Sequence, residues 1–229
     1  MHLLKYLNNR LTVAGANRAH AISFVLLKSL CPLRFWASSL LLASIALMTS
    51  CEAEEPTRED SPEMITTVIV TFTPKDGGEP VISKAVDPDG DGIRNIASDG
   101  PVTLKAETTY RLTLGMYNDL ADKDSDEYDI SAEVEHEGDE HMLFFGWTNH
   151  LFSDPPGDGN LDFREDPVLY DDADDNGLPL GLQTTWTTAS QATGVLHIVL
   201  KHQPDLKNET STSEEGESDL DVSFEIEVN

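Results

Sequence analysis

Apolar and polar residues alternate along several stretches of this 229-residue chain. The clearest is Asp219 to Val228, where every second residue from Leu220 onward is apolar and the residues between are acidic or serine. This period places the apolar side chains on one face of a strand, so it predicts a strand with one buried face. The other predicted strands are Thr66 to Thr73, Pro80 to Val86, Thr109 to Met116, Ile130 to Glu135, Met142 to Trp147, Pro167 to Tyr170, Thr184 to Thr187 and Gly194 to Lys201.

No segment after Cys51 shows a convincing helical period. Several short strands joined by turns rich in Gly, Pro and Asp predict an all-β fold. The expected architecture is an antiparallel β-sandwich, immunoglobulin-like or transthyretin-like in general form, with a small β-barrel as the alternative. Residues 64–229 are long enough for a single domain of this kind with a sizeable core.

The first 50 residues have the layout of an export signal. The apolar run Leu40 to Met48 follows Lys28 and Arg34 and is followed by Thr49-Ser50-Cys51. A transmembrane anchor would need about 20 apolar residues, whereas this run falls short even when it is extended back to Phe35. We therefore predict a signal peptide over residues 1–50. Residues 1–29 exceed what its basic region requires, which suggests a misassigned translation start.

The stretch Leu47 to Cys51 resembles the lipobox of bacterial lipoproteins. This resemblance implies that the Cys51 thiol is diacylated and that Cys51 becomes the first residue. The acidic run Glu52-Ala53-Glu54-Glu55 resembles a signal that sends some lipoproteins to the cell surface. It implies an outer-membrane lipoprotein exposed at the surface, with a periplasm-facing anchor as the alternative. Residues 51–63 would form the lipidated cysteine and a flexible tether.

The part of the chain after the predicted signal is strongly acidic. The whole chain has 15 Lys and Arg against 42 Asp and Glu, and five of the basic residues but none of the acidic ones precede Cys51. The remainder therefore carries a net charge of −32. Such a surface repels nucleic acid and anionic lipid, and makes divalent cations the natural partners.

Two acidic loops match the spacing of calcium ligands. Asp87, Asp89 and Asp91 precede Gly92, and Asp172, Asp174 and Asn176 precede Gly177. Alternate side chains converge on one ion when a glycine allows the chain to turn sharply. The loops resemble the helix-free calcium loops of extracellular repeats, and both sets are candidate calcium ligands. The alternative is ordinary turn chemistry in an acid-rich protein.

Two histidines form a second candidate site. His136 and His141 lie among five acidic residues between Glu133 and His141. If the strands predicted on either side pair as a hairpin, the two rings face each other about 5 Å apart. Imidazoles at that separation suit zinc or copper. The alternative is a solvated hairpin.

Motifs for catalysis are absent from the sequence: there is no Gly-x-Ser-x-Gly and no phosphate-binding glycine loop. The stretches Glu140 to Phe145, Tyr170 to Leu182 and Leu200 to Asp205 resemble a group of small uncharacterised outer-membrane lipoproteins, which implies a lipid-anchored β-domain without indicating an activity. We expect a non-enzymatic module that binds divalent cations and assists uptake of a metal or small solute, with an outer-membrane transporter as its candidate partner. The alternative is a surface adhesion or structural module made rigid by calcium, and a hydrolase ranks third.

Overall fold

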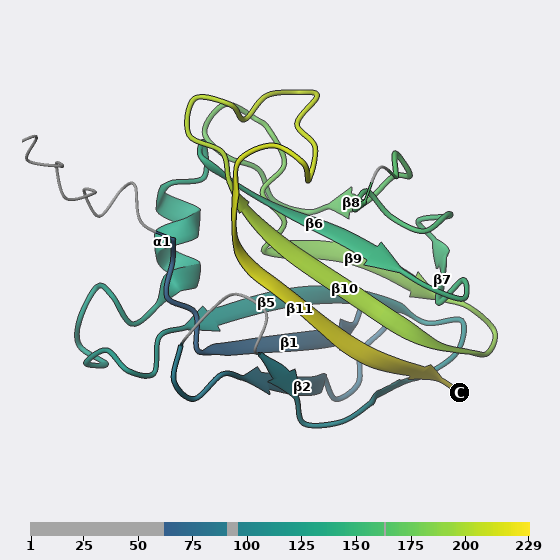
Figure 1. Ribbon diagram of the computed structural model, residues 1–229. Helices are drawn as coiled ribbons and strands as arrows, with labels where there is room; N and C mark the ends of the chain where they lie inside the picture. The colour runs from purple at the N-terminus through teal and green to yellow at the C-terminus, as the bar shows by residue number, and fades with distance from the viewer. Residues whose placement is uncertain (1–61, 91–95, 163) are drawn as a thin grey trace, which may run out of the picture. The chain divides into compact units, whose positions relative to one another are not determined.

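The computed structural model describes residues 62–90, 96–162 and 164–229. The predicted signal peptide, Cys51 and most of the predicted tether lie outside these residues, as does Asp91. The described part of the chain folds into two β-sheets and one short helix (Figure 1). Within it, no helix is long and apolar enough to cross a membrane.

The two sheets differ in size. The larger runs in the order β3-β2-β1-β5-β9-β7, and β8 also pairs with β9. Its strands are β1 (Thr67–Pro74), β2 (Val81–Val86), β3 (Ala97–Ser98), β5 (Thr109–Tyr117), β7 (Phe152–Asp154), β8 (Leu169–Tyr170) and β9 (Gln183–Thr188). The smaller runs in the order β4-β11-β10-β6 and consists of β4 (Val102–Leu104), β6 (His141–Trp147), β10 (Ala192–His202) and β11 (Glu217–Val228).

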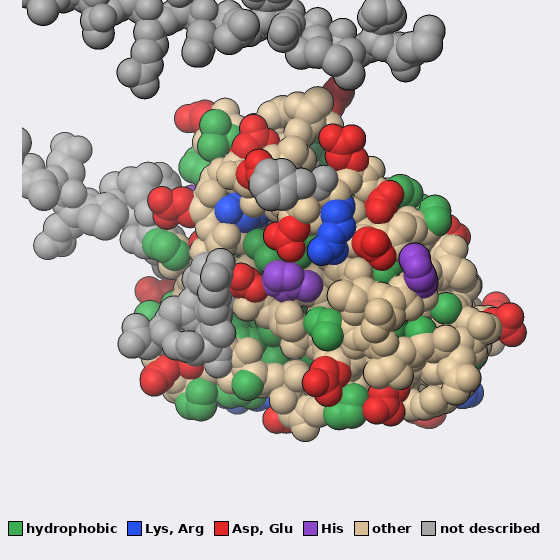
Figure 2. Space-filling model, turned by 45° about the vertical axis from the view of Figure 1, so that its right-hand side comes forward, with side chains coloured by type: hydrophobic (Ala, Val, Ile, Leu, Met, Phe, Trp, Pro, Cys, Tyr) green, Lys and Arg blue, Asp and Glu red, His purple; other side chains and the backbone are tan. Residues whose placement is uncertain are grey.

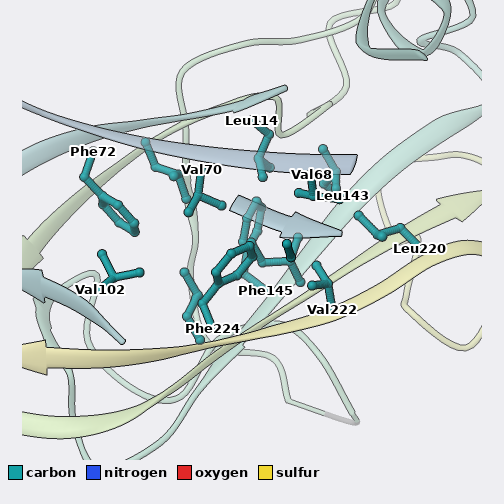
Figure 3. Packing of buried hydrophobic residues seen from close by; sticks show 14 of the residues in the cluster. Val68, Val70, Phe72, Val102, Leu114, Leu143, Phe145, Leu220, Val222 and Phe224 are labelled. Carbon is teal, nitrogen blue, oxygen red and sulfur yellow. The ribbon is translucent and has the colours of Figure 1, made fainter. Parts of the chain in front are cut away.

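The sheets pack face to face around one main apolar core. The alternate residues predicted for β11, among them Val222 and Phe224, are buried and face Val70 and Phe72 of β1 (Figure 3). Burying each such side chain contributes about 1.5 to 3 kcal/mol. The prediction of an all-β sandwich is confirmed, and the barrel alternative is wrong because the sheets remain open and separate.

The prediction of antiparallel pairing holds for every described strand pair except one. Strand β4 runs parallel to β11, with Val102 opposite Ile226. Strands β3, β4 and β7 have only two or three residues each, too few for a period of two to be recognised in the sequence.

The predicted strand Ile130 to Glu135 is wrong, because these residues form the helix α1 (Ile130–His136). Ile130 and Val134 are spaced four apart, so they share one face of a helix as well as of a strand. Both are buried, whereas Ala132 between them is exposed. The Asp129 side chain accepts a hydrogen bond from the Ala132 N–H at 3.3 Å, and this N-cap begins the helix.

Candidate metal centre

Two histidines meet at one end of the smaller sheet. His141 is the first residue of β6 and His202 is the last residue of β10, and the antiparallel register pairs them directly. Their rings stack with centroids 4.7 Å apart and planes inclined by 13°. Figure 1 shows β6 beginning, β10 ending and β11 beginning at this end, close to α1. Ladder pairing therefore fixes both imidazoles on rigid strands.

A β-bulge brings Asp219 to the same place. Leu200 of β10 pairs with Leu220 of β11, but the next residue, Lys201, pairs with Ser218. Asp219 is thus the extra residue of the bulge, a feature that redirects a side chain out of the regular alternation. Its side chain is buried although it neighbours the buried Leu220 in sequence. The result is a buried carboxylate beside the two rings.

The facing atoms of His141 and Asp219 lack hydrogen-bond partners. His141 Nε2 and Asp219 Oδ2 are 3.6 Å apart, which is too long for a hydrogen bond, and both side chains are 1 % exposed. Neither atom bonds to any other group among the described residues. Unpaired buried polar atoms are rare, because each costs about 1 to 3 kcal/mol.

The hydrogen bond on the other side of the His141 ring explains why this pair needs a cation. His141 Nδ1 lies 3.1 Å from the Glu137 carbonyl oxygen, and since a carbonyl can only accept, Nδ1 carries the hydrogen. In the neutral ring Nε2 then presents a lone pair to the Asp219 carboxylate. Two acceptors facing each other in a buried place require a proton or a metal ion between them. A histidine fixed through Nδ1 is also the usual second-sphere arrangement of a metal ligand.

The separations suit a transition metal once one of the two stacked rings turns, since a metal lies in the plane of each imidazole that binds it. Ligand atoms of His141, His202 and Asp219 all lie within 4.8 Å of one another. Two ligands on one tetrahedral zinc ion, with bonds of about 2 Å, are about 3.3 Å apart. The separation of 3.6 Å between His141 Nε2 and Asp219 Oδ2 is close to that value. Two imidazoles and one carboxylate form a donor set that zinc and copper prefer over calcium.

Further carboxylates surround the three residues. Glu63, Glu137 and His141 form a second group whose ligand atoms lie within 4.8 Å of one another. The Glu63 N–H donates to Asp219 Oδ1 at 3.3 Å. His202 Nε2 lies 3.2 Å from Glu140 Oε2, and because a carboxylate accepts, this nitrogen carries a hydrogen and leaves Nδ1 as the possible metal ligand of His202. The centre is therefore rich in negative charge.

This environment shifts two pKa values. Burial raises the pKa of Glu63 to about 7, and the carboxylates of Glu133, Asp219 and Glu137 act in the same direction. Burial alone would lower the pKa of His141, but the Asp219 carboxylate and the Glu137 carbonyl outweigh it, so this pKa is raised above 6.5. Both shifts favour the protonated form of the group.

The structure separates the two histidines that the sequence suggested as a pair. His136 is exposed at the last turn of α1, whereas His141 is buried. The hairpin that would have placed their rings face to face does not form, because α1 occupies the position of its first strand. Of the two candidates, only His141 belongs to the groups described above.

The aspartates of the two candidate calcium loops make different contacts. In the first loop Asp87 is buried, and its N–H donates to the Thr66 carbonyl at 2.8 Å. Asp89 lies two residues further along the chain, and Asp91 lies outside the described residues. In the second loop both oxygens of Asp172 accept backbone hydrogen bonds, from Gly181 and Gln183, each at 2.8 Å.

Asp174 is held by its own turn and by a lysine. Its Oδ1 accepts from the N–H groups of Asn176 and Leu178 at 2.9 and 2.8 Å, and its Oδ2 lies 2.9 Å from Lys207 Nζ. The two side chains of this ion pair are fully buried, whereas Asn176 is exposed. A calcium ion would compete with the Lys207 ammonium for Asp174, and calcium binding at this loop stays a prediction.

Sequence reasoning did not assign His202, Asp219 or Glu63 to a site. His202 had a detectable signal, since it follows the predicted strand Gly194 to Lys201 directly. Asp219 occupies a polar position of a regular alternation, so nothing local distinguishes it from Asp221. Glu63 lies in the predicted tether, 78 residues before His141.

Comparison with known proteins adds no relative: no family model, no curated protein and no solved structure matches this chain. The immunoglobulin-like or transthyretin-like form accordingly stays a prediction.

Proposed function

We propose that this domain binds a divalent transition metal, zinc or copper, through His141, His202 and Asp219. The observation that carries the proposal is the separation of 3.6 Å between His141 Nε2 and Asp219 Oδ2, two buried acceptors that lack a hydrogen-bond partner within the described residues. A metal ion bound by both would satisfy both. Its charge would also offset that of Glu63 and Glu137 beside them.

Burial of the ligands favours holding a metal over using it for catalysis. His141, His202 and Asp219 are 1, 9 and 2 % exposed. A catalytic zinc ion keeps an open position for water or substrate, whereas a structural or transported ion is enclosed by protein ligands. We therefore propose a non-enzymatic binding role.

The wider role rests on charge and on the N-terminal sequence. Acidic side chains are spread over the face shown in Figure 2, in keeping with the net charge of −32 after the predicted signal. Such a surface raises the local concentration of cations. We propose that Cys51 carries a lipid anchor in the outer membrane and that the domain delivers metal or a small solute to an uptake system. Cys51→Ser should abolish labelling by radioactive fatty acid, and retained label would contradict the anchor.

Titration of chelator-treated protein with zinc and with copper by calorimetry tests the metal proposal. We expect one site per chain in the wild type, and a loss of affinity of about tenfold or more in His141→Ala, His202→Ala and Asp219→Asn. His136→Ala is the matched control, because this histidine is close in sequence to His141 but exposed. Unchanged binding in all three site variants would contradict the proposal. Calcium alone in the purified protein would favour the structural alternative.

A further inference from the structure

The centre includes a residue from the chain before the first strand. Glu63 precedes β1, which starts at Thr67, while Glu137 is the C-cap of α1 and the other ligands lie on β6, β10 and β11. In Figure 1 the chain before β1 runs alongside α1. We propose that Glu63 completes the coordination of the metal, and that metal binding thereby fastens residues 62–64 to the end of the smaller sheet. This inference rests on the proposed function.

Three residues leave a coordination position to be filled. Structural zinc sites almost always have four protein ligands, and His141, His202 and Asp219 supply three. His141 also belongs to the group formed with Glu63 and Glu137, so these two carboxylates are candidates for a fourth ligand beside His141.

Contacts of the backbone favour Glu63 over Glu137. The Glu137 N–H bonds to the Glu133 carbonyl at 2.9 Å and its own carbonyl orients His141, so Glu137 already acts through its main chain. The Glu63 N–H instead donates to Oδ1 of Asp219, and the other oxygen of this carboxylate, Oδ2, faces His141. Glu63 is thus attached to a metal ligand, and its half-buried side chain lies within reach of His141.

Residues 62–64 have few attachments to the rest of the domain. The hydrogen bond from Glu63 to Asp219 is long, at 3.3 Å, and Met64 is 48 % exposed. A cavity of about 250 Å³ separates the segment from α1 and is lined by Pro62, Glu63, Met64, Ile130 and Glu133 among others. Regular pairing with the larger sheet begins at Thr66, whose N–H bonds to the Tyr117 carbonyl at 3.0 Å. A metal bond to Glu63 would therefore add a strong attachment where the chain has little else.

The consequence is a link between metal occupancy and the chain that leads to Cys51. Without metal, residues 62–64 can separate from the sheet end at small cost. With metal, the same residues are joined to β6, β10 and β11 at once.

Hydrogen exchange followed by mass spectrometry tests the inference on the full protein, with zinc as the probe and calorimetry on the same samples. We expect zinc to slow exchange in the peptide covering residues 62–66 of the wild type and of Glu137→Gln. Glu63→Gln keeps the backbone hydrogen bond but loses the carboxylate. It should bind zinc about tenfold more weakly, with no zinc-dependent protection of that peptide.

Two results would overturn the inference while leaving the proposed function intact. One is wild-type affinity in Glu63→Gln, and the other is a loss of affinity and protection in Glu137→Gln alone. Absence of zinc binding by the wild type would overturn both proposals. Since a melting curve shows whether each variant is folded, loss of the fold is distinguished from loss of a ligand.

Discussion

The loop around Asp174 and the centre around Asp219 are both rich in carboxylates, yet the carboxylate oxygens face different groups in the two places. In the loop, backbone N–H groups and the Lys207 ammonium face the oxygens of Asp172 and Asp174. In the centre, Asp219 Oδ2 faces another acceptor and lacks a hydrogen-bond partner within the described residues. The loop carries the more recognisable ligand motif, but the centre has the greater need for a cation. The proposed metal centre therefore rests on two buried acceptors that face each other, and not on ligand spacing in the sequence.

The largest effect should come from breaking the ion pair of the loop. Lys207→Met leaves the Asp174 carboxylate buried without its cation, and loss of one partner of a buried pair costs about 3 to 5 kcal/mol. Urea denaturation measures this loss of unfolding free energy. Lys75→Met is the control, because Lys75 Nζ lies 4.0 Å from Asp171 Oδ2 in a partly exposed pair and should contribute less than about 1 kcal/mol. Equal small losses in both variants would show that the loop does not depend on Lys207.

Zinc should stabilise the centre by the next largest amount. At a free concentration of about 100 times Kd, binding to the folded state adds about 2.7 kcal/mol, which raises Tm by about 5 to 10 °C for a domain of this size. Scanning calorimetry with zinc and with chelator measures the difference. Asp219→Asn and His202→Ala should abolish it, whereas Lys207→Met should retain it. A zinc effect that is lost in Lys207→Met but kept in Asp219→Asn would place the metal in the loop.

The pH dependence should differ in sign with and without metal. The pKa of His141 is raised above 6.5 by Asp219 and the Glu137 carbonyl, so the stability that the charged ring contributes is complete below pH 6.5. It is lost as the pH rises through the raised pKa. Metal-free protein should therefore lose stability, on the order of 1 kcal/mol, as the pH rises above 6.5.

The added stability from zinc should instead grow with pH, because zinc needs the neutral ring. Denaturation midpoints at three pH values measure both trends. In Asp219→Asn the metal-free trend should flatten. An identical slope in Asp219→Asn would show that another group produces it.

The smallest effect concerns Glu63 in the absence of metal. Its pKa of about 7 lies above the ordinary 4.5, so its contribution to stability is present below pH 4.5 and is lost as the pH rises through 7. Glu63→Gln should stabilise metal-free protein at pH 8 by on the order of 1 kcal/mol or less, because partial exposure screens the repulsion. At pH 4 the two proteins should be equally stable. The same substitution should weaken zinc binding, so a single variant gives two effects of opposite sign.

The sequence predicts the fold better than the centre, for a physical reason. The alternation from Leu220 to Val228 is a local property of one strand, and the structure confirms it. The spacing of Ile130 and Val134 fits the period of a strand as well as that of a helix. Whether the segment forms a helix therefore depended on the Asp129 cap and on packing against the sheets. The position of Asp219 depends on the register between β10 and β11, a relation between two segments that neither contains by itself.

The bulge at Asp219 also makes the proposed metal centre separable from the core. The pairing from Leu220 through Val228 is regular, and the extra residue, Asp219, falls just before it. The regular buried face of β11 therefore ends at Leu220. Deletion of that one residue would let the ladder continue to Ser218 without disturbing Val222 or Phe224. A simple sandwich and a metal-binding one would therefore differ by a single codon, and the ligand could be gained or lost in evolution while the rest of the domain stayed the same.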